Sequence, residues 1–425
     1  MKHSTLVATM ALIALLLGAV QTASAIPVFA RQYQTSCTTC HVAFPRLNEF
    51  GKEFMASNYR MPDWRDTTMD ASDDLLALPK SVPLAIRAQA YFQGRTGKGV
   101  IVDQTTGFVT GLQHADTDFQ APYLIKLLSS APLSDHITYY FYGIFAEKGG
   151  NLETIIEDAW FRHDDVFGSG IGLMLGQFQI SDLMFPRETR LTFQDLIAYR
   201  MAGITYDRGV ILDRGTGPID IAIGAVNGNG IEQNIKINSP GFQRPDRMFD
   251  NNSGKTGFGR IGVGIGPVDI GAFGLWGKQR DNGDTRDTIK RIGGIDASGN
   301  YNDKILWYAQ FLWNAWDDFI NPGVNYRWQA GFAGIDYVLN DHWTFSTLYN
   351  LADAGDFEGT GTVYEGIDVN SLTFTASYYF MRNVKLVAEV NADFLGRETL
   401  TATSLEGQQH LTKEHYALVG FDAAF

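Results

Sequence analysis

The sequence is poor in cysteine, has no surplus of basic residues and contains no long apolar run after its first 25 residues. Its two cysteines cannot supply the four ligands of a structural zinc site. Its 34 Lys and Arg against 47 Asp and Glu give a formal charge of -13, which argues against a nucleic-acid partner. The lack of long apolar runs argues against a helical membrane protein. No glycine-rich nucleotide-binding loop stands before a predicted helix.

The first 25 residues combine a basic start, an apolar run and a small-residue end. Lys2 precedes the apolar run Leu6–Val20, and Ala23-Ser24-Ala25 follows it. This order is typical of a secretory signal peptide, so we expect the mature chain to begin at Ile26. The alternative is an uncleaved membrane anchor, but the run is short against the roughly 20 residues that a spanning helix needs.

From about residue 83 to residue 425, the chain consists of segments of alternating polarity. The connections between them alternate between short turns and long Gly-rich loops. Tilted transmembrane β-strands have this pattern, and outer-membrane barrels have an even number of them. A final strand ending on Phe425 resembles the assembly signal of bacterial outer-membrane proteins. The sequence thus predicts an all-β, antiparallel transmembrane barrel of about 16 strands in the outer membrane. The predicted strands are 84–94, 123–131, 137–147, 155–162, 171–178, 203–212, 219–227, 258–265, 268–276, 289–296, 305–314, 326–337, 343–351, 372–380, 384–394 and 415–425.

Charged residues on these strands should mostly face the lumen, because charge on the lipid face is costly. The bulky, charged loop Asp182–Arg190 is expected to fold into the lumen as well. Tryptophans near strand ends are expected to form interface girdles, namely Trp307, Trp313, Trp316, Trp328 and Trp343. The charged residues are Arg87, Lys126, Glu157, Asp158, Arg162, Arg200, Asp220, Asp269, Lys385 and Glu389.

The two cysteines lie in Cys37-Thr38-Thr39-Cys40-His41, the C-x-x-C-H pattern of covalent c-type haem attachment. Two thiols must reach the two vinyl groups of one porphyrin, and the adjacent histidine must reach the iron. A disulfide or redox pair would leave His41 unexplained and would need a thioredoxin-like setting that is absent. We therefore predict one haem c bound through Cys37 and Cys40, with His41 as an iron ligand.

Residues 26–82 form the predicted monohaem cytochrome segment, which is short for an independent fold. We expect it to lie inside the barrel and to use the wall as a shell. Phe44, Leu47, Phe50 and Phe54 recur at helical spacing and should cover one haem face.

A six-coordinate haem also needs a distal ligand. Met61, followed by Pro62, resembles the Met-Pro loop of many cytochromes c, and a thioether would raise the reduction potential. Met55 and Met69 are alternative candidates. His114, His136 and His163 are further candidates for the distal ligand, although histidines in such positions are more often simple surface residues.

With these residues in view, the chain resembles the fused monohaem cytochrome-porins of bacterial outer membranes, a family implicated in extracellular Fe(II) oxidation. The resemblance implies that His41 binds iron and that electrons cross the membrane through a haem inside the pore. It is most specific over Pro27, Phe29–Gln32, Cys37–His41, Phe44, Pro45, Leu47, Phe50, Gly51, Phe54, Asn58 and Tyr59.

The expected activity is therefore electron transfer of the Fe(II):cytochrome c oxidoreductase type. Fe(II) or another extracellular donor would reduce the haem near the outer mouth, and a periplasmic cytochrome or other soluble carrier would accept the electron. Outer-membrane lipid is the other expected partner. Two alternatives stay open, namely a haem-plugged diffusion porin and an outward-directed reductase, because the direction of electron flow depends on ligation and burial.

Overall fold

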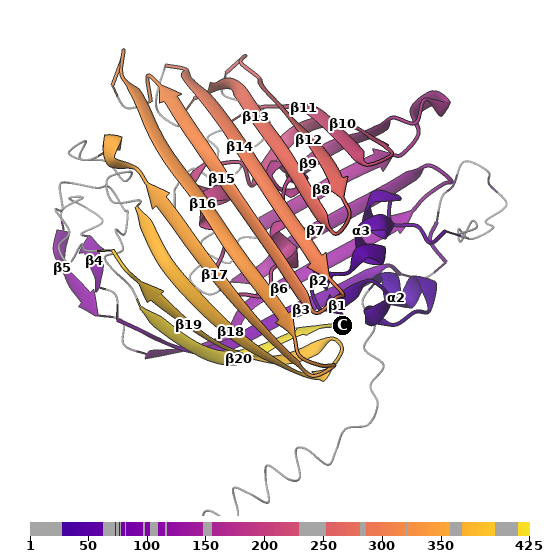
Figure 1. The fold of residues 1–425 in the computed structure, drawn as a ribbon, viewed down its shortest axis with the longest axis horizontal. Helices are drawn as coiled ribbons and strands as arrows, with labels where there is room; N and C mark the ends of the chain where they lie inside the picture. Colours follow the sequence, from indigo (N-terminus) through magenta and orange to yellow (C-terminus); the bar gives the residue numbers. More distant parts are fainter. Residues whose placement is uncertain are drawn as a thin grey trace, which may run out of the picture.

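Sixteen strands close into one barrel in the computed structural model, and short helical elements lie at one end of it (Figure 1). The structure describes residues 28–62, 73, 76, 78–80, 82–96, 98–102, 109–114, 117–147, 155–228, 252–280, 286–319, 321–357, 368–395 and 415–425. The predicted signal peptide, residues 1–25, and Met69 lie outside these residues. Among these residues, none of the helices has the length and apolar character that a membrane-spanning helix requires.

Each barrel strand pairs with its sequence neighbours in antiparallel register, and the last strand closes on the first through pairs such as Phe421 with Ala90. All sixteen predicted segments overlap one strand each, so the predicted fold class is confirmed. The barrel strands are β3 (Leu84–Arg95), β6 (Thr117–Pro132), β7 (Ile137–Glu147), β8 (Ile155–His163), β9 (Gly172–Gln179), β10 (Tyr206–Thr216), β11 (Ile219–Val226), β12 (Thr256–Ile265), β13 (Val268–Gln279), β14 (Thr288–Tyr301), β15 (Ile305–Asp317), β16 (Asn325–Val338), β17 (Trp343–Asp353), β18 (Val369–Met381), β19 (Val384–Asp393) and β20 (Tyr416–Ala424).

The strands alternate between a lumenal and an outer face, as their sequence period of two requires. On β11, Ile219, Ile221 and Ile223 are exposed on the outer face. Trp316 and Trp328 are instead buried, so their predicted place in an interface girdle is wrong. They occupy lumen-facing positions of β15 and β16, whereas Trp313 is exposed on the outer face.

Short and long connections occupy opposite ends of the barrel, which confirms the predicted alternation. Residues 217–218, 266–267 and 382–383 are tight turns at the end that holds the C-terminal residue. The opposite end carries the long connections, one of which contains an additional hairpin of β4 (Lys98–Val102) and β5 (Val109–His114) (Figure 1). The sequence pattern did not reveal this hairpin. Two further short elements, η2 (Val166–Gly168) and η5 (Gly355–Phe357), lie in other connections.

The connection from β9 to β10 enters the lumen and contains η3 (Ile180–Leu183), η4 (Arg187–Thr189) and α4 (Ile197–Met201). We call residues 180–205 the lumenal segment. Its apolar side chains join a buried core with the wall, in which Leu196 and Tyr199 pack with Leu312, Phe332 and Leu348. The lumen is thus a packed interior on this side.

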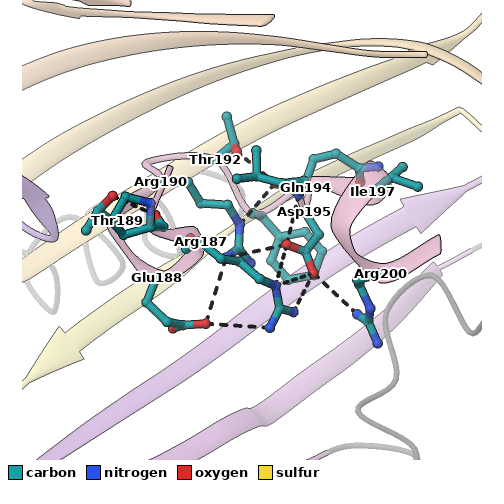
Figure 2. A network of polar contacts seen from close by, with 12 residues as sticks. Arg187, Glu188, Thr189, Arg190, Thr192, Gln194, Asp195, Ile197 and Arg200 are labelled. Atoms are coloured by element: carbon teal, nitrogen blue, oxygen red, sulfur yellow. Dashed lines mark hydrogen bonds and ion pairs between the residues drawn. The ribbon is translucent and has the colours of Figure 1, made fainter. Parts of the chain in front are cut away.

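Ion pairs hold the lumenal segment in shape (Figure 2). Arg187 donates from Nη2 to Asp195 Oδ2 at 2.5 Å, and Arg190 and Arg200 face the same carboxylate. Arg200 lies on α4, so its prediction as a strand residue is wrong. The buried environment of the lumenal segment gives its sequence an apolar texture that resembles a strand.

The charged side chains of the wall mostly face inward, as predicted. Lys126, Glu157, Lys385 and Glu389 are buried in the lumen. Glu157 and Asp158 are neighbours yet both point inward, because a register shift between β7 and β8 interrupts the alternation there. Asp220 and Asp269 also share the parity of the lumen-facing residues on their strands, but near the short turns their side chains are 67% and 51% exposed.

The N-terminal segment, residues 28–62, fills the barrel at the short-turn end (Figure 1). Tyr379 donates its hydroxyl hydrogen to the Phe44 carbonyl at 2.7 Å, and Asn58 donates to the His136 carbonyl at 3.0 Å. Arg46 forms a 3.3 Å ion pair with the fully buried Asp336 of β16. The segment is thus held by the wall, as expected. Its elements are α2 (Val28–Tyr33), η1 (Cys37–Thr39), β1 (His41–Ala43), β2 (Arg46–Leu47) and α3 (Glu49–Ala56).

Candidate functional site

A cavity of about 470 Å³ brings the residues of the C-x-x-C-H motif together inside the barrel. Cys37, Cys40 and His41 line it from the N-terminal segment, and the wall and the lumenal segment complete it with mostly apolar side chains. Its volume lies within the range of about 300–1,000 Å³ that cofactor sites occupy. The motif therefore faces a partly open cavity of suitable size.

One helical turn, η1, sets the spacing of the two thiols. The Ser36 hydroxyl oxygen accepts a hydrogen bond from the Thr38 backbone N–H at 3.3 Å and thereby caps the turn. The Cys40 N–H donates to the Cys37 carbonyl at 3.2 Å and closes it. Residues three apart in a 3-10 turn lie on one side, so both thiols face the cavity.

The imidazole of His41 is oriented by a hydrogen bond to the backbone of its own segment. Its Nδ1 lies 3.0 Å from the carbonyl oxygen of Pro45. Because a carbonyl only accepts, Nδ1 carries the proton and Nε2 keeps its lone pair. Burial lowers the pKa of His41 to about 4, so the ring is neutral at pH 7. This is the form in which histidine binds a metal ion.

The two cysteines lack the features of a redox-active pair. They form no disulfide, and burial raises the pKa of both thiols. Redox-active pairs have instead a lowered pKa. The described residues also contain no group of three or more His, Cys, Asp and Glu side chains that could hold a metal ion. The residues present fit a covalently attached haem better than a redox-active cysteine pair or a metal site built from several protein ligands.

Asn48 and Gly51 hold the motif against α3. The Asn48 side chain accepts from the Gly51 N–H at 2.8 Å and donates to the Thr39 carbonyl at 3.1 Å. The Asn48 N–H donates to the Cys40 carbonyl at 3.0 Å. A Cβ at Gly51 would overlap the Cys40 carbonyl oxygen, so only glycine allows this close approach.

Three of the four residues predicted as apolar cover lie at the cavity. Phe44, Leu47 and Phe54 line the cavity, whereas Phe50 is not part of its lining. Across the cavity the wall adds Tyr140 and Trp160, whose stacked ring centroids are 5.1 Å apart. No local pattern in the sequence marks these two residues as part of the site.

Three methionines line the cavity, and one of them was not foreseen. Met55 and Met61 come from the N-terminal segment, as predicted, while Met174 comes from β9 of the wall. The competing histidines His136 and His163 stack on each other at 5.3 Å and do not line the cavity. His114 is the last residue of β5, and its side chain is not among those that the structure describes. Met55, Met61 and Met174 thus remain candidates for a distal ligand.

Charged side chains meet at the rim of the cavity. Arg162 donates to the Asp213 carboxylate at 2.5 Å and to the Ala56 carbonyl at 3.2 Å. From the lumenal segment, Asp182 lines the same cavity, which confirms that this predicted loop enters the lumen. Burial raises the pKa of Asp182 to about 7. Arg87 lies on the rim as well, with a carboxylate of Asp422 at 2.8 Å.

The site lies at the short-turn end of the barrel. Arg60 pairs with Asp164 of the β8–β9 turn at 2.7 Å, and Asn58 accepts from the Thr138 hydroxyl at 2.9 Å through its carbonyl. In outer-membrane barrels this end faces the periplasm. The expectation of a haem near the outer mouth is therefore wrong, because the segment that carries the motif contacts the short-turn ends of the strands.

Comparison with known proteins finds porins of similar fold. An anion-selective porin from Comamonas acidovorans aligns with a TM-score of 0.52 and 11% identity over 81% of this chain and 99% of that one. OmpF of Salmonella typhi, in complex with daunomycin, aligns with a TM-score of 0.50 and 12% identity over 81% and 98%. OmpT of Vibrio cholerae, in its trimer form, aligns with a TM-score of 0.50 and 11% identity over 81% of this chain and 99% of that one.

The sequence matches no protein-family model and no curated protein. The likeness to the porins concerns the fold alone. A closed sheet of this size with an apolar outer wall is a membrane-spanning structure of the bacterial outer membrane. The chain is therefore an outer-membrane β-barrel of porin-like fold.

Proposed function

We propose that this outer-membrane barrel carries one covalent haem c in its lumen and transfers electrons across the membrane, with extracellular Fe(II) as the donor. The observation that carries the proposal is the convergence of Cys37, Cys40 and His41 on one cavity inside a closed barrel. Fe(II) as donor and a periplasmic cytochrome or other soluble carrier as acceptor are implied by the family resemblance stated above.

Each residue of the motif has a separate part in this proposal. Cys37 and Cys40 hold the porphyrin through thioether bonds, and His41 is the iron ligand whose orientation the Pro45 carbonyl sets. A haem bound there supplies one-electron redox chemistry, and a thioether from Met61 would raise its potential. Electron transfer of this kind breaks no bond in the donor, so no general acid or base is required.

The place of the site in the barrel supports transfer to a periplasmic acceptor. The N-terminal segment closes the short-turn end, where a soluble carrier in the periplasm can approach it. Toward the other end, the lumen is packed with buried rings such as those of Tyr308, Trp316 and Phe332. The electron from an extracellular donor must cross this packed interior, which the wall insulates from lipid.

The same packing argues against the diffusion-porin alternative. Solute passage needs a continuous aqueous path, yet in the described residues the lumenal segment and the wall share one apolar core. Bilayer conductance of the purified protein distinguishes the two functions. We expect a conductance far below that of an open 16-stranded porin, and a conductance equal to such a porin would favour the alternative.

Rapid mixing with Fe(II) tests the redox proposal. The purified protein is mixed anaerobically with Fe(II) at several pH values, and the absorbance of the reduced haem is followed in time. We expect rapid reduction. The Cys37→Ala/Cys40→Ala variant is the matched control, which should lack covalent haem by intact mass. A haem that dithionite reduces but Fe(II) does not would show that iron is the wrong donor and would favour the outward-directed reductase.

A further inference from the structure

The outer face of the barrel has a hollow of about 620 Å³ near the long-loop ends of β14 to β17. Its exposed side chains include Arg291, Trp313, Arg327 and Asp353. These positions alternate along the strands with lumen-facing residues such as Ile292. The hollow therefore opens toward the membrane side of the wall and is separate from the haem cavity.

Two small residues form the floor of this hollow. Ala315 of β15 pairs with Arg291 on one side and with Arg327 on the other, so the two guanidinium groups flank a methyl group. In the next row, Gly293 pairs with Trp313, and a Cβ at Gly293 would meet no atom within 4 Å. The strand register thus leaves a depression between two arginines and beside an indole.

The two arginines differ in how far their guanidinium groups are already engaged. Arg291 donates to the Asp317 carboxylate at 2.5 Å, which fixes the direction of its side chain. The Asp356 carboxylate accepts from the backbone N–H of Arg327 at 2.8 Å. Among the described residues, no hydrogen bond or ion pair engages the guanidinium of Arg327, which leaves its planar donors available to a phosphate.

The depth of the hollow identifies the membrane region that it meets. Toward the short turns, the outer wall becomes apolar, with Ile295, Ile335 and Leu351 exposed. Charged side chains on the lipid face are tolerated only near the interface. The arginines therefore lie at the boundary between the hydrocarbon and the headgroups of the outer leaflet.

We propose that this hollow binds the phosphorylated sugar headgroup of an outer-leaflet glycolipid. Its phosphate lies between Arg291 and Arg327, because bidentate guanidinium groups match phosphate geometry. The sugar ring packs beside Trp313, and its hydroxyls meet Gln329 and Asp353, which line the hollow. The mixed charge of the lining suits a headgroup with both phosphate and hydroxyl groups.

Native mass spectrometry of the full-length protein in detergent, titrated with bisphosphorylated lipid A, tests this site. We expect Arg291→Gln/Arg327→Gln to weaken lipid A binding by about tenfold or more, since each arginine near a membrane surface adds attraction to phosphate. Arg382→Gln, at an exposed arginine by the short turns, is the matched control and should bind like the parent protein. Unchanged thermal unfolding of the double variant shows that its barrel is intact.

Two further probes separate the lipid sources. Dephosphorylated lipid A and phosphatidylglycerol should both bind the parent protein more weakly than lipid A does. The proposal is overturned if dephosphorylated lipid A or phosphatidylglycerol binds the parent protein as tightly as lipid A does. It is also overturned if the double variant binds lipid A as tightly as the parent protein does. A double variant that changes its number of subunits while its lipid binding stays the same would identify the hollow as a subunit contact and would equally overturn it.

Discussion

The ion pair between Arg46 and Asp336 should hold the N-terminal segment in the barrel. Its atoms are 3.3 Å apart, and the Asp336 side chain is 0% exposed. The guanidinium also lies 4.7 Å from the ring centroid of Phe185 and 5.1 Å from that of Tyr308. Arg46→Ala leaves a buried carboxylate unpaired, and breaking a buried pair in this way costs about 3–5 kcal/mol.

Hydrogen exchange of residues 28–62 measures this loss. A loss of about 3 kcal/mol in the opening free energy corresponds to exchange that is faster by roughly a hundredfold. In Arg46→Met/Asp336→Leu both charges are gone, and we expect most of the protection to return because no buried charge is left unpaired. Arg382→Ala removes an exposed pair with Asp341 and should change exchange little. Unchanged exchange in Arg46→Ala would refute the reasoning.

Three further predictions concern the cavity. Gly51→Ala should reduce the yield of haem-loaded protein several-fold, because a Cβ there overlaps the Cys40 carbonyl. Gly274→Ala, with open space around it, is the control and should load haem normally. The measurement is the haem content per protein. Met61→Ala should lower the reduction potential and abolish the optical signature of thioether ligation; if only Met174→Ala does so, the ligand comes from the wall. Burial raises the pKa of Asp182 from 3.8 to about 7, so the folded state binds the proton more tightly. Its contribution to stability should be lost as pH rises from about 4 through about 7, and pH-dependent unfolding of Asp182→Asn should lack this component.

The barrel could be predicted because its signal is local and repeated. The segment 137–147 coincides with β7, since a period of two over one strand length fixes both ends. The inward positions of Trp316 and Trp328 were missed, although they share the parity of Leu312 and Leu306 on β15 and of Ala330 on β16. Counting parity along each strand would have placed both rings in the lumen.

The lumenal segment and the wall side of the site were harder to foresee. Met174 and Asp182 reach the cavity only because the barrel closes, and no local pattern links them to Cys37. Residues such as Arg200 lie in a short helix buried on every side, where helical and strand periods cannot be told apart over five residues. The position at the periplasmic end could have been inferred, since an even number of strands places the start of the first strand and the end of the last strand at the same end of the barrel, beside the short turns.

Electron transfer into sealed vesicles tests the central claim most directly. The full-length protein is inserted into liposomes that enclose ferric cytochrome c, Fe(II) is added outside without oxygen, and the absorbance of the enclosed cytochrome is followed. We predict that the enclosed cytochrome becomes reduced with the parent protein and stays oxidised with Cys37→Ala/Cys40→Ala. If both proteins leave it oxidised in vesicles that remain sealed, the barrel does not conduct electrons from Fe(II) and the account is wrong.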